Sequence, residues 1–175
     1  MYKRQAPKYL GARLDGGYSD HIIVPHSKYI VSYGDMDPAQ AAPYACSGLT
    51  AFSALKKIPT TSKDDWIIII GAGGVGINGI LLSPAVHKAK ILVIDNDPEK
   101  RKKAIEAGAN EAFSPDEETE IRNKIGIGSA AVIDFVGRPE TTDLGLTLVR
   151  KGGMVIVVGL YGGSLKLSLP LVPMR

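Results

Sequence analysis

Four consecutive isoleucines run directly into a cluster of glycines in the segment WIIIIGAGGVGING, residues 66–79. A strand that is apolar on both faces must be buried on both faces, which is typical of parallel sheets covered by helices. The glycines that follow mark a place where the backbone turns sharply or lies very close to another group. This segment therefore requires a fold with a buried strand and a tight turn at its carboxyl end.

From residue 66 onward, apolar runs alternate regularly with segments of helical character. The pattern predicts strands at 66–70, 90–95, 111–114, 130–136 and 154–159, separated by helices at 74–87, 98–108, 117–125 and 139–150. Strands that alternate with helices of this kind indicate an α/β fold with a doubly wound parallel sheet and right-handed crossovers. Because proline cannot continue a helix, Pro84 is expected to kink or end the first of these helices.

The first 43 residues have a different character, with short apolar runs interrupted by glycine and proline. They predict two short strands, at 18–25 and 29–34, and a short helix at 38–42, and a longer helix is predicted next, at 47–57. Two short strands cannot bury a core of their own. We therefore interpret residues 1–43 as the end of a β-rich domain, and residues 44–175 as a linking helix followed by the sheet domain.

Composition excludes several classes of function. A chain of 175 residues that is 45% hydrophobic can bury one sizeable core, and its net charge of +3 is too small to favour nucleic acid or a membrane as partner. The basic run at residues 100–103 is typical of a solvated helix face. A single cysteine excludes an internal disulfide and is compatible with a reducing compartment, and no apolar run approaches the length of a membrane span. We expect a cytoplasmic protein.

The glycine cluster fits the G-x-G-x-x-G pattern at a strand-to-helix junction, with Gly71, Gly73 and Gly76 at the three glycine positions. In this pattern the first glycine permits the tight turn, the second lets the backbone approach a pyrophosphate, and the third lets the helix pack on the strand. The free N–H groups of a helix N-terminus favour the anion. Residues 71–76, with Gly74 and Val75 among them, are therefore predicted to bind a dinucleotide.

Asp95 ends the second predicted strand, about 20 residues after the glycines. A carboxylate at this position accepts hydrogen bonds from the adenosine ribose and repels a 2′-phosphate, so the sequence favours NAD over NADP. The alternative interpretation is a glycine-rich turn next to a surface aspartate.

With the dinucleotide site placed, the chain resembles the zinc-dependent medium-chain alcohol dehydrogenases. The resemblance is carried, in order along nearly the whole chain, by the motifs GGYSDHIIVP, AAPYACSGLTAFSALKK, IIIIGAGGVG, VIDNDPEKRKKAIEAGAN, AVIDFVGRPETTDLGLTLVRKGGMVIVVGLYGG and LPLVPMR. It implies a Rossmann-type NAD-binding domain, lacking its sixth strand, after a short remnant of a GroES-like, β-rich catalytic domain.

The resemblance also implies roles for particular residues. Cys46 matches a ligand of the catalytic zinc, Thr50 a catalytic threonine near the nicotinamide, and Lys100 a residue that holds the adenosine ribose. Further cofactor contacts are implied for the ends of the fourth and fifth strands, at Val136, Arg138, Val158, Gly159 and Leu160. Taken alone, a cysteine such as Cys46 is more often a buried packing residue, the valines are equally compatible with core packing, and Lys100 is equally compatible with a solvated surface.

The sequence also departs from the family pattern. The other ligands of the catalytic zinc, a first cysteine and a His-Glu pair, have no counterpart, and the four cysteines of a structural zinc are missing. His21, His26 and His87 do not replace them, and one thiolate cannot hold a zinc ion that needs three protein ligands. We expect an internal portion of a dehydrogenase about twice as long, beginning after the structural-zinc lobe and ending before the last strand.

The expected function is that of an NAD-dependent zinc alcohol dehydrogenase acting on an alcohol, aldehyde or ketone, with this chain binding NAD weakly and inactive alone. Two alternatives are a non-catalytic NAD-binding module and a zinc-free enzyme similar to the quinone reductases; Cys46 in its motif argues against the latter. The last predicted strand, MVIVVG at residues 154–159, would lie unpaired at the sheet edge, which predicts a homo-oligomer.

Overall fold

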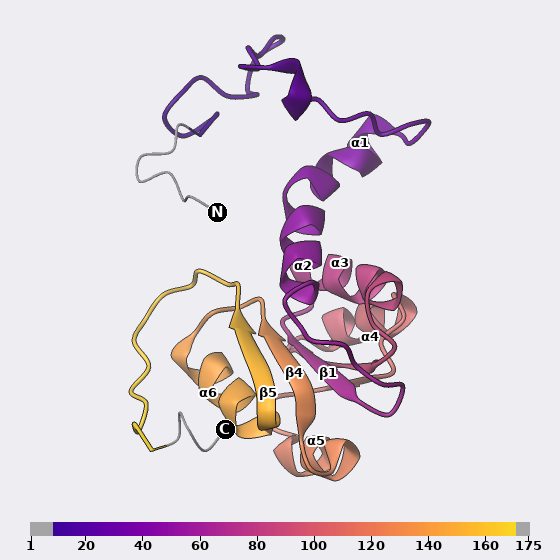
Figure 1. The fold of residues 1–175 in the computed structure, drawn as a ribbon, viewed down its shortest axis with the longest axis vertical. Helices are drawn as coiled ribbons and strands as arrows, with labels where there is room; N and C mark the ends of the chain where they lie inside the picture. The colour runs from indigo at the N-terminus through magenta and orange to yellow at the C-terminus, as the bar shows by residue number, and fades with distance from the viewer. Residues whose placement is uncertain (1–8, 171–175) are drawn as a thin grey trace. The chain divides into compact units, whose positions relative to one another are not determined.

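The computed structural model describes residues 9–170 and divides the chain into two compact units, residues 1–40 and residues 41–175 (Figure 1). Residues 171–175, the last part of the LPLVPMR motif, lie outside the described residues. Within residues 9–170, no helix is long and apolar enough to cross a lipid bilayer.

The first unit has little regular structure in its described part. Its elements are a 3-10 turn, η1 (Ser27–Tyr29), an isolated bridge between Leu10 and Leu14, and the start of a short helix, α1 (Pro38–Ala41). The strands predicted at 18–25 and 29–34 are absent from the described residues, so that prediction was wrong. The side chains of Ile23 and Val31 are 89% and 80% exposed. Within the described part of this unit, an extended segment would find no partner strand for its backbone hydrogen bonds and no core in which to bury its side chains. The apolar runs therefore do not form strands.

The second unit contains the predicted α/β alternation. Its elements, in chain order, are η2 (Ala42–Ala45), α2 (Ser47–Leu55), β1 (Trp66–Ile70), α3 (Gly74–Leu82), η3 (Ser83–Ala85), β2 (Lys90–Ile94), α4 (Pro98–Glu106), β3 (Glu111–Phe113), α5 (Glu118–Ile125), β4 (Ser129–Asp134), α6 (Pro139–Leu148) and β5 (Val149–Val157). The helix containing Pro84 was predicted to kink or end there, and α3 does end at Leu82 before a 3-10 turn.

Within residues 9–170 the five strands form one sheet in the order β3-β2-β1-β4-β5, and every pair is parallel. The predicted α/β, doubly wound parallel sheet is confirmed. β5 begins five residues earlier than predicted because its first part is irregular: the register with β4 shifts between Ser129 and Ala131, and Gly152 has a φ of +72°. A bulge of this kind is not visible as an apolar alternation.

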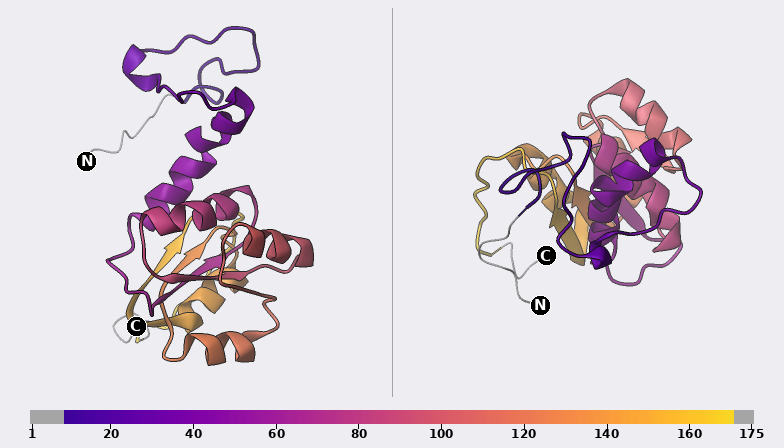
Figure 2. Two further views of the ribbon diagram at one scale, coloured as in Figure 1. Left: turned by 90° about the vertical axis from the view of Figure 1, so that its right-hand side faces the viewer. Right: turned by 90° about the horizontal axis from the view of Figure 1, so that it is seen from above.

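β1 lies at the centre of the sheet and is buried on both faces, as its sequence required. Ile67 and Ile69 pack in the cluster formed with α2, α3 and α4, whereas Ile68 and Ile70 pack with α5 and α6. The sheet runs between these two helical layers in Figure 2. Since burial of an isoleucine side chain contributes roughly 1.5–3 kcal/mol, this strand is a major source of the unit's stability.

An ion pair joins the amino-terminal ends of two strands that are far apart in sequence. Asp65 precedes β1, and its carboxylate accepts a hydrogen bond from the Ser62 backbone N–H (2.7 Å) and another from the Arg150 guanidinium in β5. The Ser62 N–H lowers the pKa of the Asp65 carboxyl, and Arg150 lowers it further, while burial opposes both. The charged carboxylate is therefore the form that stabilises the fold.

Replacement of Asp65 by asparagine is expected to lower the free energy of unfolding at pH 7 by about 1 kcal/mol. A group whose pKa is lowered by folding contributes stability above its unfolded pKa and loses it as pH falls through its folded pKa. The difference between wild type and Asp65→Asn should therefore narrow as the pH falls below about 4. Urea unfolding of both proteins from pH 7 to below about pH 4 measures this difference in the free energy of unfolding. The neighbouring exposed Asp64, changed to asparagine, serves as control, and an equal effect of both variants would contradict the assignment.

Candidate dinucleotide-binding site

The glycine turn joins the carboxyl end of β1 to the amino end of α3. Gly71 has a φ of +92°, a conformation that other residues rarely adopt, and its N–H donates to the Ile94 carbonyl of β2 over 2.8 Å. A Cβ on Gly76 would lie 1.9 Å from the Gly71 carbonyl oxygen. The helix can therefore approach the strand this closely only because position 76 has no side chain.

Gly73 and Gly74 differ from these two glycines because a Cβ at either position would meet no atom within 4 Å. Gly73 is the N-cap of α3 and has ordinary extended backbone angles, φ −72° and ψ −171°. Neither the fold nor the backbone thus requires glycine at position 73. The free space over it, at the N-terminus of a nine-residue helix, suits the close approach of a pyrophosphate.

Asp95 follows β2 directly and is almost buried, with 7% of its surface exposed. One carboxylate oxygen accepts the Ala72 N–H of the glycine turn over 2.8 Å, and the other accepts the Asp97 N–H over 2.9 Å. A carboxylate offers about four acceptor positions, so capacity remains for sugar hydroxyls. Asp95 thus holds the glycine turn in place and presents an acceptor at the carboxyl end of β2.

A cavity of about 380 Å³ brings most of the predicted cofactor residues together at the carboxyl ends of β1, β2 and β4. Nine of the predicted residues line it: Gly71, Gly73, Gly74, Val75, Gly76, Asp95, Lys100, Val136 and Arg138. Ligands of open parallel sheets bind outside the carboxyl ends of the strands, where the strand order reverses. In this sheet the reversal falls between β1 and β4, next to the cavity.

Three residues of this cavity were missed by the sequence analysis: Asn96, Phe135 and Tyr161. Asn96 and Phe135 adjoin predicted residues, so their neighbours in the chain could have indicated them. Tyr161 lies in the irregular segment after β5 and had no periodic signal. The Arg138 guanidinium stacks on its ring at 3.7 Å from the centroid, which holds a positive charge at the cavity wall.

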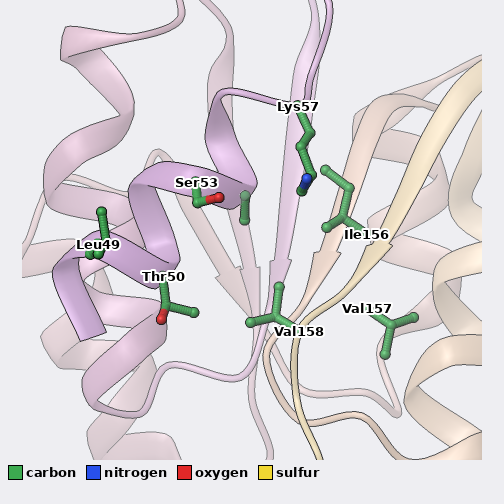
Figure 3. Close-up of a pocket in the computed structure, with 8 residues that line it drawn as sticks. Leu49, Thr50, Ser53, Lys57, Ile156, Val157 and Val158 are labelled. Atoms are coloured by element: carbon green, nitrogen blue, oxygen red, sulfur yellow. The ribbon is translucent and has the colours of Figure 1, made fainter. Parts of the chain in front are cut away.

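Thr50 and Val158 line a second cavity, of about 360 Å³, between α2 and the end of β5. Figure 3 shows their side chains coming from these two different elements. α2 is tied to α3 by the Asn78 amide, which donates to the Ser47 hydroxyl over 3.1 Å. The remaining two predicted residues, Gly159 and Leu160, line a third cavity of about 330 Å³, which Arg138 also borders.

Cys46 lies at the N-cap of α2 with an exposed side chain, one turn before Thr50, whose N–H donates to the Cys46 carbonyl over 2.9 Å. Among residues 9–170, no group of three or more histidine, cysteine, aspartate or glutamate side chains is placed to hold a metal ion. One exposed cysteine does not fit the three-ligand set of a catalytic zinc. No catalytic step through zinc can be derived from these residues.

The strand order, the glycine turn and the acid at the end of β2 together define a dinucleotide-binding α/β domain of the Rossmann type. A family model described as zinc-binding dehydrogenase matches residues 74–175, more than half of the chain. The chain belongs to the zinc-binding medium-chain alcohol dehydrogenase family.

Relatives of known identity agree with this membership. The chain is 37% identical over 161 residues to an NAD-dependent alcohol dehydrogenase of Sulfolobus acidocaldarius, covering 91% of this chain and 46% of the relative. It is 32% identical to an NADP-dependent D-arabinose 1-dehydrogenase of Saccharolobus solfataricus, over 90% of this chain and 47% of that one. The crystal structure of an alcohol dehydrogenase from Aeropyrum pernix superposes with a TM-score of 0.84 at 29% identity, over 94% of this chain and 49% of that one. The chain spans about half the length of these relatives.

Gly73→Ala tests the role of the free space over the glycine turn. Because a Cβ there meets no protein atom, the free energy of unfolding should change by less than about 1 kcal/mol. The methyl group would occupy the approach to the turn, so the dissociation constant for NAD should rise at least about tenfold, equivalent to ~1.4 kcal/mol. Gly17→Ala, which also adds a Cβ in open space with an ordinary φ, is the control. Unchanged NAD affinity in Gly73→Ala would contradict a pyrophosphate-binding role of this turn.

Proposed function

We propose that this chain binds NAD and forms the coenzyme-binding part of an NAD-dependent alcohol dehydrogenase. The observation that carries the proposal is the single cavity that joins the glycine turn, Asp95 and two cationic side chains, Lys100 and Arg138. Backbone N–H groups with nearby cations suit a pyrophosphate, and the carboxylate suits the ribose hydroxyls. We propose that residues 44–175 form the NAD-binding domain with its linking helix, and residues 1–43 the end of a GroES-like catalytic domain.

The choice between NAD and NADP rests on Asp95. Relatives with both cofactor names match this chain at similar coverage, so likeness alone does not select one. A 2′-phosphate next to the Asp95 carboxylate would place two negative charges together in a site shielded from water. NAD, with a free 2′-hydroxyl, avoids this repulsion and donates a hydrogen bond to the carboxylate.

The proposed reaction is oxidation of an alcohol, or reduction of the matching aldehyde or ketone, by the whole enzyme. Bound NAD supplies the hydride acceptor. Thr50 and Val158 would contact the nicotinamide end in the second cavity, and Val136, Gly159 and Leu160 would enclose the cofactor from the ends of β4 and β5. Zinc belongs to this proposal as a cofactor of the whole enzyme, with Cys46 as one ligand.

A second candidate is a non-catalytic NAD-binding chain. It is favoured by the observation that no group of three or more potential metal ligands lies among the described residues, where Cys46 is the one zinc ligand that the family resemblance implies. The zinc-free reductase alternative receives no such support, since Cys46 stands in the motif of the zinc enzymes. The dehydrogenase and the non-catalytic chain both require NAD binding. They differ in whether the chain gains dehydrogenase activity once the other zinc ligands are supplied.

Calorimetric titration with NAD and with NADP, alongside zinc analysis of the same sample, is the test. Binding of NAD at least about tenfold tighter than NADP is expected, because of the charge repulsion at Asp95. Less than one zinc per chain should be found. Failure of both nucleotides to bind would refute the proposed function, and tightly held stoichiometric zinc would show that Cys46 finds further ligands.

We also propose that the chain self-associates through β5. The opposite edge of the sheet is protected, since β3 is three residues long and Glu111 within it pairs with Lys124 of α5. The outer edge of residues 154–157 in β5 carries no charged side chain, and within the described chain no strand follows it in the sheet. An apolar edge of this kind is a template for pairing with another strand.

Val157→Lys places a charge on this edge at a side chain that is 52% exposed, and it should shift the chain toward monomer in light scattering. Ile105→Lys, at a 46% exposed position on α4, adds the same charge away from the edge and is the control. A wild-type chain that is monomeric at working concentration, or an equal effect of both variants, would contradict pairing through β5.

A further inference from the structure

Asp134, the last residue of β4, is a completely buried carboxylate with 0% of its surface exposed. Burial of a carboxylate is costly unless donors satisfy it. In the described part of the chain its carboxylate forms no salt bridge, so neutral donors alone compensate its burial. A carboxyl group held in this way at a strand end, next to the candidate site, indicates a role beyond packing.

Four donors surround the Asp134 carboxylate. One oxygen accepts the N–H groups of Val136 and Gly137, both over 2.9 Å, and the other accepts the hydroxyls of Thr141 (2.9 Å) and Thr142 (2.8 Å). Its side chain therefore fixes both the turn that follows β4, residues 135–138, and the first part of α6.

The backbone carbonyl of Asp134 makes a second set of contacts. It accepts the N–H of Val158 over 2.8 Å and that of Gly159 over 3.1 Å, which ties down the segment after β5. One residue thus connects the turn after β4, the start of α6 and the end of β5. These segments supply residues to all three cavities of the candidate site.

Val136 connects the turn after β4 to the glycine turn by direct packing. A Cβ built on Gly71 would lie 2.7 Å from Val136 Cγ2, so the Val136 side chain lies directly against the first glycine of the turn. Any shift of the turn after β4 therefore moves the wall against which the glycine turn is packed. Asp134 itself is enclosed and its acceptors are engaged, so it is not placed to touch a ligand.

We propose that Asp134 is a positioning residue of the dinucleotide site, which holds the turn after β4 against the glycine turn in the geometry that binds the cofactor. This inference rests on the proposed function, NAD binding in the cavity between these turns. A residue that acted only on stability would lower the melting temperature and leave the affinity of the folded protein unchanged. Affinity measured well below the melting temperature separates the two roles.

The test compares Asp134→Asn with Ser129→Ala. Asparagine keeps the shape of the side chain but presents an NH₂ group to one pair of donors. Ser129 is the control, because it lies at the opposite end of β4, is equally buried, and donates to the Leu148 carbonyl over 3.1 Å. Both variants should lose stability. The dissociation constant for NAD should rise at least about tenfold in Asp134→Asn and less than about twofold in Ser129→Ala. An NAD affinity of Asp134→Asn within about twofold of wild type would overturn the proposal.

Amide hydrogen exchange without nucleotide separates this inference from the proposed function. Exchange at Gly71 and Ala72 should be faster in Asp134→Asn but not in Ser129→Ala, because the glycine turn loses its packed wall. If wild type binds no NAD, the proposed function fails, and unchanged exchange at these two amides then also refutes positioning by Asp134. If Asp134→Asn does not fold, Thr142→Val, which removes one of the donors to the carboxylate, is used in its place. It should raise the dissociation constant for NAD and speed exchange at the two amides, both by less than is expected for Asp134→Asn.

Discussion

The burial of β1 on both faces is the constraint on which the rest of the second unit depends. Ile67 and Ile69 cannot leave water without α2, α3 and α4 on one side, and Ile68 and Ile70 require α5 and α6 on the other. A strand with these two needs must lie inside the sheet, with a parallel neighbour on each side. Its carboxyl end then falls next to the reversal of strand order, where open α/β sheets bind their ligands.

Carboxylates at two strand ends hold the loops of the candidate site in place. Asp95 after β2 accepts an N–H of the glycine turn, and Asp134 at the end of β4 accepts two N–H groups of the next turn. In both cases a buried acceptor fixes the backbone of a loop that would otherwise have several conformations. The two carboxylates differ in whether a ligand can reach them: Asp95 lines the cavity, whereas Asp134 is fully enclosed. This difference separates the proposed ligand contact from the proposed positioning role.

Most strands and helices after residue 65 could be predicted, because each is specified by its own apolar period and turn residues. The prediction of strands is wrong at residues 18–34, because an apolar run forms a strand only where a partner strand is present. It was incomplete at β5, whose irregular start around Gly152 has no periodic signature. Nine of the predicted cofactor residues line one cavity, but the Arg138–Tyr161 stack was not foreseen, since Tyr161 belongs to a segment without regular structure.

The sequence by itself determined the class of fold, the place of the glycine turn and the acid at the end of the second strand, because these depend on spacing within one βαβ unit. It also carried the family resemblance that the comparisons confirmed. Only the tertiary structure decided that Asp134 holds three segments together, because its partners come from a turn, a helix and a strand end up to 25 residues away. It also decided that Gly76 is required for packing whereas Gly73 faces open space. Such distinctions depend on what lies across the fold, which spacing along the chain does not specify.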